Sequence, residues 1–146
     1  MKGAFITMIK LIVGKEGGGK TKVLIDLANE TLKKTKGNIV YLDYDNNNMY
    51  QIDYRIRFMS VTEYKIVDES GLYGFICGVI ASNYDVENIY IDGIYKLTNK
   101  EISELKDFID ALGEIEIKYN VNFIITVSGL ADDLPDFLNK YIIEAI

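Results

Sequence analysis

A glycine-rich segment near the start of the chain constrains its fold more than any other feature. Residues 14–21 read Gly-Lys-Glu-Gly-Gly-Gly-Lys-Thr and fit the pattern G-x-x-x-x-G-K-[ST] in full. The apolar run 8–13 precedes this segment, and residues 21–34 follow it with apolar side chains at helical spacing. Because strand, loop and helix come in this order, the pattern predicts a phosphate-binding loop rather than a flexible glycine turn.

Each residue type in this loop has a physical role. Glycines let the backbone curl so that successive N–H groups point at phosphate oxygens, and the N-terminus of the next helix adds positive potential. Lys20 is expected to reach the β- and γ-phosphates, and Thr21 to supply a hydroxyl for Mg²⁺. The sequence therefore predicts a P-loop NTPase with ATP and Mg²⁺ as cofactors. The predicted nucleotide-binding residues are Gly14, Lys15, Glu16, Gly17, Gly18, Gly19, Lys20 and Thr21.

Composition narrows the function further. A chain of 146 residues with 49% hydrophobic content fits one nucleotide-binding domain, residues 1–146. The net charge is -6 and the lysines are scattered, so we expect no general nucleic-acid binding. Histidine is absent, which removes imidazole as a base or metal ligand.

The apolar stretch 72–81 is too short to cross a bilayer, and its single cysteine, Cys77, favours a reducing compartment. We expect a soluble cytoplasmic protein without membrane insertion.

Alternating apolar runs and helical segments predict an α/β fold. We expect three layers, α/β/α, with a mainly parallel sheet of about five strands in the RecA-like (ASCE) arrangement. Residues 52–61 are ambiguous between a short strand and an irregular connection. Residues 1–7 are either a leader before the first strand or, in part, an extension of it. The predicted strands are 8–13, 38–43, 88–92, 121–127 and 141–146, and the predicted helices are 21–34, about 70–82, about 99–119 and 132–139.

Two helices carry more detailed predictions. The helix that ends near Ser82 would begin at Asp68 or Ser70, and its face of Gly71, Gly74 and Gly78 would pack against the sheet. The helix that ends near Tyr119 would begin with a capping box of Thr98 and Glu101. Its inward positions would be Ile102, Leu105, Ile109 and Leu112.

Acidic residues end two of the predicted strands. The run Ile89-Tyr90-Ile91-Asp92 resembles the Walker B element, in which the acid orients Mg²⁺ and its bound water, although a strand-terminal acid can also be merely solvated. Asp43 is the rival for that role and the candidate for positioning the attacking water, with Asp45 as a further possibility. The predicted catalytic residues are Lys20, Asp43 and Asp92, and the predicted metal ligands are Thr21 and Asp92.

Two further sets of side chains have both a functional and a structural interpretation. Thr126 and Ser128, at the end of a strand, would sense the γ-phosphate or form local turn hydrogen bonds. Arg55 and Arg57 are either arginine fingers for a neighbouring subunit or surface residues paired with Asp53 and Glu63, and the surface interpretation is favoured.

The sequence resembles two families of nucleotide-binding proteins. The loop is similar to the deviant Walker A of the ParA and MinD family, with Lys15 at the signature lysine, but Glu16 stands where that family has glycine. Nearly the whole chain resembles small bacterial ATP-binding proteins sometimes labelled twitching-motility or PilT-like, through residues 14–21, 38–43, 74–78 and the strand that ends at Asp92. This second resemblance implies nucleotide binding.

Three functions remain open at this point. The first is a slow Mg-ATP-dependent ATPase that a second copy or a protein partner completes. The second is an ATP-binding sensor or assembly module with little hydrolysis, which Gly93 after Asp92 favours because many related enzymes carry a glutamate there. The third is a small-molecule kinase. The guanine-selective N-K-x-D pattern is absent, since Glu101 and Ile102 follow Asn99-Lys100, so ATP is preferred to GTP.

Overall fold

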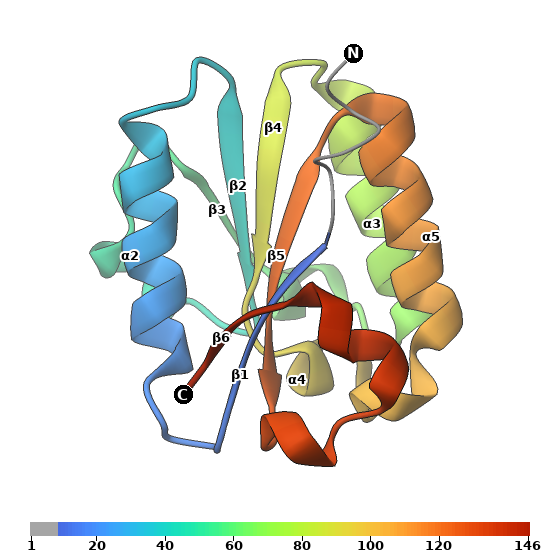
Figure 1. Cartoon of the computed structure of the whole chain (residues 1–146). Helices are drawn as coiled ribbons and strands as arrows, with labels where there is room; N and C mark the ends of the chain where they lie inside the picture. Colours follow the sequence, from blue (N-terminus) through green and yellow to red (C-terminus); the bar gives the residue numbers. More distant parts are fainter. Residues whose placement is uncertain (1–8) are drawn as a thin grey trace.

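In the described part of the chain, six parallel strands form the sheet at the centre of the molecule (Figure 1). The computed structural model describes residues 9–146, so the prediction of a leader over residues 1–7 lies outside the described part. The strands are β1 (Lys10–Gly14), β2 (Asn38–Asp43), β3 (Arg57–Ser60), β4 (Val86–Ile91), β5 (Asn122–Ser128) and β6 (Ile142–Ala145). Their order across the sheet is β3-β2-β4-β5-β1-β6.

Helices cover both faces of this sheet. The α-helices within residues 9–146 are α2 (Lys20–Leu32), α3 (Glu69–Ser82), α4 (Ile94–Thr98) and α5 (Lys106–Tyr119). Helix α2 lies on one face, and α3 and α5 lie on the other (Figure 1). This confirms the predicted three-layer α/β/α fold. Short 3-10 helices complete the chain: η1 (Met49–Gln51), η2 (Val61–Tyr64), η3 (Ile102–Glu104), η4 (Ala131–Asp133) and η5 (Asp136–Tyr141).

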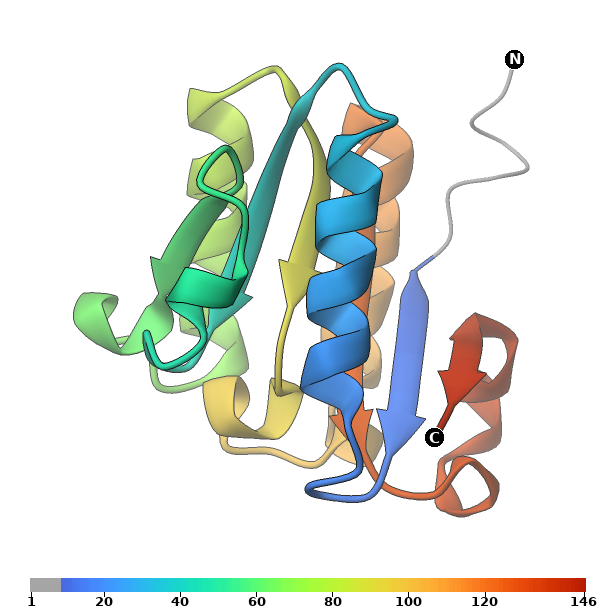
Figure 2. The ribbon, with the colours of Figure 1, turned by 90° about the vertical axis from the view of Figure 1, so that its left-hand side faces the viewer.

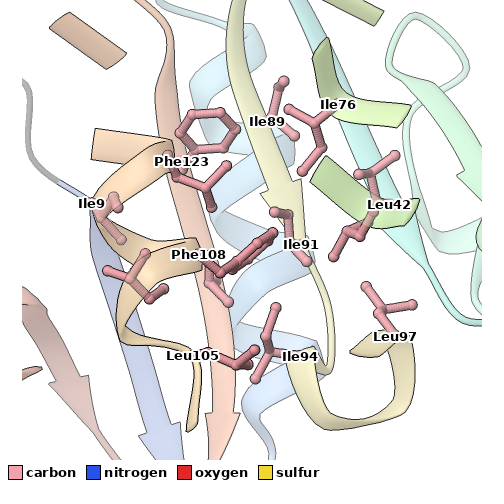
Figure 3. Packing of buried hydrophobic residues seen from close by; sticks show 14 of the residues in the cluster. Ile9, Leu42, Ile76, Ile89, Ile91, Ile94, Leu97, Leu105, Phe108 and Phe123 are labelled. Atoms are coloured by element: carbon pink, nitrogen blue, oxygen red, sulfur yellow. The ribbon is translucent and has the colours of Figure 1, made fainter. Parts of the chain in front are cut away.

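The core is divided between the two faces of the sheet. Side chains alternate along each strand, so Leu11 and Val13 join the cluster under α3 and α5, while Ile12 joins the cluster under α2. Figure 3 shows the larger cluster, in which Ile91 of β4 lies among side chains of several elements. Strands buried on both faces are apolar throughout, as parallel sheets require.

The carboxyl ends of the strands meet along one edge. Parallel strands all point the same way, and the loop between β1 and α2 lies at the end where their arrowheads point (Figure 2). Helix α4 lies at this same end (Figure 2). In open α/β sheets ligands bind outside the carboxyl ends of the strands, so the fold brings the candidate residues to the expected place.

Several details of the fold differ from the sequence predictions. The sheet has six strands rather than about five because the ambiguous segment 52–61 contributes β3. The helix expected from about residue 99 begins at Lys106, and α4 precedes it. The predicted capping box of Thr98 and Glu101 is wrong: Glu101 and Glu104 form the capping box of η3, while the Thr98 hydroxyl donates to the Ile94 carbonyl (2.8 Å) within α4. The four predicted inward positions are nevertheless buried, namely Ile102, Leu105, Ile109 and Leu112.

The glycine face of α3 points away from the sheet. Asp68 caps this helix by accepting a hydrogen bond from the Gly71 amide (2.9 Å). Its buried side chains are Leu72, Ile76 and Ile80, and Gly71, Gly74 and Gly78 are exposed. Large apolar side chains bury more surface than glycine, so they determine which face meets the core.

Two 3-10 helices, η4 and η5, take the place of the helix predicted over residues 132–139. Pro135 separates η4 from η5, since a proline disfavours helical backbone in the residue before it. Within the described residues 9–146, no helix combines the length and the apolar character needed to span a bilayer.

Candidate functional site

The glycine-rich loop joins β1 to α2 in a conformation that needs glycine. Gly17 and Gly19 have φ values of +74° and +97°, a region that side chains with a Cβ rarely adopt. The Gly18 amide donates to the Lys15 carbonyl (2.9 Å), and a Cβ on Gly18 would lie only 2.9 Å from that same oxygen. The glycine spacing therefore has a steric cause in the fold.

Lys20 turns back into this loop from the first position of α2. Its side chain is buried, and its Nζ donates to the carbonyls of Gly14 (3.1 Å) and Lys15 (2.8 Å). Among residues 9–146, Lys20 forms no ion pair. An ammonium group surrounded by neutral carbonyls keeps its full charge available to an anion.

Asp92 follows β4 directly and is the hub of the polar contacts. It is buried, and its Oδ1 accepts hydrogen bonds from the hydroxyls of Thr21 (3.3 Å) and Thr126 (2.9 Å). Its Oδ2 accepts a hydrogen bond from the phenol of Tyr41 (3.0 Å). The two predicted metal ligands, Thr21 and Asp92, are thus in direct contact.

These oxygens suit a hard divalent cation. Mg²⁺ prefers carboxylate, hydroxyl and phosphate oxygens, and it is usually held by one or two protein groups while water and substrate phosphates complete its shell. A hydroxyl and a carboxylate oxygen 3.3 Å apart fit that requirement. No cluster of three acidic or cysteine side chains within the described residues offers an all-protein alternative.

Tyr41 is a site residue whose contact with Asp92 was not predicted from the sequence. It lies on β2 with no exposed surface, and its ring stacks between those of Phe58 (5.8 Å) and Tyr90 (6.4 Å). Burial, reinforced by the nearby Asp92 and Asp43, raises the pKa of the Tyr41 phenol far above its usual value. The phenol therefore keeps its proton and donates a hydrogen bond to Asp92.

Thr126 and Ser128 do not form the local turn hydrogen bonds that were one of their two predicted roles. Thr126 is fully buried on β5; besides donating to Asp92, its hydroxyl accepts a hydrogen bond from the Gly93 amide (2.6 Å). These contacts cross between strands, so they are not local turn hydrogen bonds. Ser128 is exposed, and its hydroxyl donates to Glu16 in the loop (3.4 Å).

Asp43 ends β2 and is also buried. One carboxylate oxygen accepts from the Tyr44 amide (2.7 Å) and the other from the Asn48 side chain (3.2 Å). Burial and the charge of Asp92 raise the pKa of the Asp43 carboxyl to about 6. A carboxyl with such a pKa can accept a proton near neutral pH, which a general base requires.

A single cavity of about 970 Å³ connects these groups. It is lined by the loop residues 15–21, by Asp43 and Asp92, and by the start of α4. Neither Arg55 nor Arg57 lines this cavity. Arg55 forms the predicted surface ion pair with Asp53, through Nη2 to Oδ2 (2.9 Å), and Arg57 is exposed on β3.

Comparison with known proteins identifies the fold. No family model matches the chain, and no curated protein matches its sequence. Among solved structures, the chain is similar to the flagellar accessory protein FlaH from Methanocaldococcus jannaschii, with a TM-score of 0.51 and 18% identity. The match covers 90% of this chain and 65% of that one.

A likeness at this level of identity shows the fold alone. The comparison supports the predicted RecA-like arrangement but not membership of the twitching-motility, PilT-like family that the sequence resembles. The chain therefore has a three-layer α/β/α fold around a parallel sheet, similar to that of FlaH.

Proposed function

We propose that the chain binds Mg-ATP in this cavity and hydrolyses it slowly, with a second copy or a protein partner completing the site. The observation that carries the proposal is the contact between Thr21 and Asp92 in the same cavity as the buried ammonium of Lys20. A glycine-rich loop, a lysine and a hydroxyl–carboxylate pair are the groups that bind a nucleoside triphosphate with its metal.

The phosphates would be held by the loop. Its backbone amides and the N-terminus of α2 attract anions, and Lys20 would exchange its contacts with the Gly14 and Lys15 carbonyls for phosphate oxygens. Thr21 and Asp92 would hold Mg²⁺, which, when bound, neutralises charge on the β- and γ-phosphates. ATP as the ligand and the single thiol of Cys77 favour a cytoplasmic location.

Asp43 is the candidate for orienting the attacking water. Its hydrogen bonds to Tyr44 and Asn48 fix the carboxylate, and its raised pKa suits the acceptance of a proton. Strand β2 pairs with β4, which ends at Ile91 directly before Asp92, so Asp43 and Asp92 share one end of the sheet. This arrangement supports hydrolysis of a bound nucleotide.

The hydrogen bonds of Asp43 also keep a second function, an ATP-binding sensor or assembly module, as a candidate. Both oxygens of Asp43 already accept hydrogen bonds, and Gly93 rather than a glutamate follows Asp92. Such a module would need the residues that bind the phosphates and the metal, but it would not need a residue that acts as a general base. The two functions share a binding site and differ only in turnover.

Two carboxamide variants separate these functions. We expect Asp92→Asn to lose most of the Mg²⁺-dependent gain in ATP affinity, because an amide binds Mg²⁺ more weakly than a carboxylate. Asp43→Asn should bind ATP like the wild type and release phosphate at least tenfold more slowly, since general-base catalysis contributes about 10²–10⁴-fold. Affinity would be measured by calorimetry with a non-hydrolysable ATP analogue, and turnover by phosphate release.

The outcomes are distinct. ATP binding with no phosphate release from either the wild type or Asp43→Asn would leave the binding module as the function. Transfer of phosphate to a nucleoside in a substrate panel would favour a kinase. Absence of ATP binding by the wild type would refute the proposal as a whole.

A further inference from the structure

Helix α4 is a short rigid element at the rim of the cavity. Ile94 and Leu97 are each 1% exposed, and Figure 3 shows both side chains in the core with Ile91 and Leu105. The Thr98 hydroxyl closes the helix by bonding to the Ile94 carbonyl. A helix anchored on its inner side by these contacts holds its outer residues in a fixed position.

Lys96 is an exposed residue of this helix at the cavity. It lines the cavity that the glycine-rich loop and Asp92 also line. Its stem lies over Gly93, where a Cβ would be 3.9 Å from both Cβ and Cδ of Lys96. The cavity is lined by two further lysines, Lys15 and Lys20, which both belong to the loop.

Lys96 shares the cavity with the acids Glu16, Asp43, Asp45, Asp92 and Glu101, and it forms an ion pair with none of them. Lys96 forms no ion pair with any residue between positions 9 and 146. An unpaired ammonium at the rim of an anion-binding cavity attracts a phosphate group.

We propose that Lys96 is a second phosphate-binding lysine, which contacts the terminal phosphate and makes the site prefer nucleoside triphosphates to diphosphates. This inference rests on the proposed Mg-ATP binding. Mg²⁺ held by Thr21 and Asp92 would neutralise charge on the β- and γ-phosphates. The stem of Lys96 lies over Gly93, which directly follows Asp92, so Lys96 lies close to this proposed metal ligand and would meet the phosphates that the metal contacts. Lys96, four residues after Asp92, belongs to α4 and thus to a different element from the loop.

The test compares two nucleotides in four proteins. Calorimetry with Mg²⁺ would measure the affinity of a non-hydrolysable ATP analogue and of ADP for the wild type, Lys96→Ala, Lys96→Arg and Lys36→Ala. Lys36 is an exposed lysine in the turn between α2 and β2, and it serves as the matched control for lost charge. Thermal unfolding would verify that each variant folds.

We expect Lys96→Ala to weaken binding of the triphosphate analogue about tenfold and binding of ADP less than about twofold, as for the loss of one charge-assisted contact. Lys96→Arg should retain most of the preference, and Lys36→Ala should behave like the wild type. Equal losses for both nucleotides, or no loss for either, would overturn the inference while leaving nucleotide binding intact. A wild type that binds neither nucleotide would overturn the proposed function and this inference with it.

Discussion

The phenol of Tyr41 donates a hydrogen bond of 3.0 Å to Oδ2 of Asp92, and this bond links β2 to the acid that follows β4. Tyr41 pairs in register with Tyr90 on β4 and with Phe58 on β3, so the three rings form a stack across neighbouring strands. The stack fixes the ring of Tyr41, and the hydrogen bond from its phenol orients the carboxylate of Asp92. The orientation of a candidate metal ligand thus depends on packing in the core.

Replacing this tyrosine should weaken metal binding more than nucleotide binding. Tyr41→Phe keeps the ring and removes the donor to Asp92, and loss of a partner that orients a metal ligand costs about tenfold or more in metal affinity. We therefore expect the gain in ATP affinity on adding Mg²⁺ to fall about tenfold. Titrations of an ATP analogue with Mg²⁺ and with EDTA would measure that gain.

The matched control is Tyr90→Phe in the same stack. The hydroxyl of Tyr90 contacts Thr31 (2.5 Å) and the Leu27 carbonyl on α2, and it does not contact Asp92. Its removal should cost stability, about 0.5–1.5 kcal/mol for one hydrogen bond, without changing the effect of Mg²⁺. Equal changes in the two variants would mean that Tyr41 supports only the fold.

We expect a buried glutamate on α5 to make the stability of the fold depend on pH. Glu116 of α5 is 1% exposed and accepts a hydrogen bond from the Phe123 amide (2.9 Å). Burial raises the pKa of its carboxyl from 4.5 to about 7. Between these pH values the folded chain binds more protons than the unfolded chain, so this group makes the free energy of unfolding fall as pH rises from about 4.5 to about 7.

The variant Glu116→Gln should remove that fall. Glutamine retains an acceptor for the Phe123 amide and cannot ionise. The free energy of unfolding of the variant, relative to that of the wild type, should therefore rise by on the order of 2–3 kcal/mol between pH 4.5 and pH 8. Urea unfolding at the two pH values would measure the change. Glu114→Gln, an exposed position on the same helix, is the control. A constant difference between Glu116→Gln and the wild type at both pH values would contradict the prediction.

Two glycines should respond to alanine in opposite directions. Gly93 has a φ of +83°, so Gly93→Ala should destabilise the fold by about 1–3 kcal/mol through backbone strain. Gly74 lies on the exposed face of α3, where a Cβ meets nothing within 4 Å. Gly74→Ala should stabilise the helix by about 0.5–1 kcal/mol. Chemical denaturation measures both, and destabilisation by Gly74→Ala would show that the glycine face packs against another surface.

The sequence predicted those parts of the molecule whose causes are local. The order of β1, loop and α2 follows from the glycine pattern and the apolar spacing around it, and these elements form as expected. Apolar strands separated by helices predicted a parallel sheet covered on both faces, which is confirmed. Acids at the ends of β2 and β4 were expected at one edge, and Asp43 and Asp92 both line the cavity there.

The features that escaped prediction depend on short elements or on strand order. Helix α4 has five residues, which is too short for a helical period, and it begins after a glycine with positive φ. The contacts of Asp92 with Tyr41 and Thr126 join positions 51 and 34 residues apart. They require β4 to lie between β2 and β5, and nothing in the local sequence specifies that order.

Nucleotide binding through Lys20 is the central claim, and one titration tests it most directly. Calorimetry with a non-hydrolysable ATP analogue and Mg²⁺ would compare the wild type with Lys20→Ala and with Lys22→Ala, an exposed lysine of the same helix that pairs with Asp26. We predict binding by the wild type and Lys22→Ala, and a loss of at least about tenfold in Lys20→Ala, since Lys20 supplies charge-assisted contacts to the phosphates. Equal binding by all three proteins, or binding by none, would contradict this account.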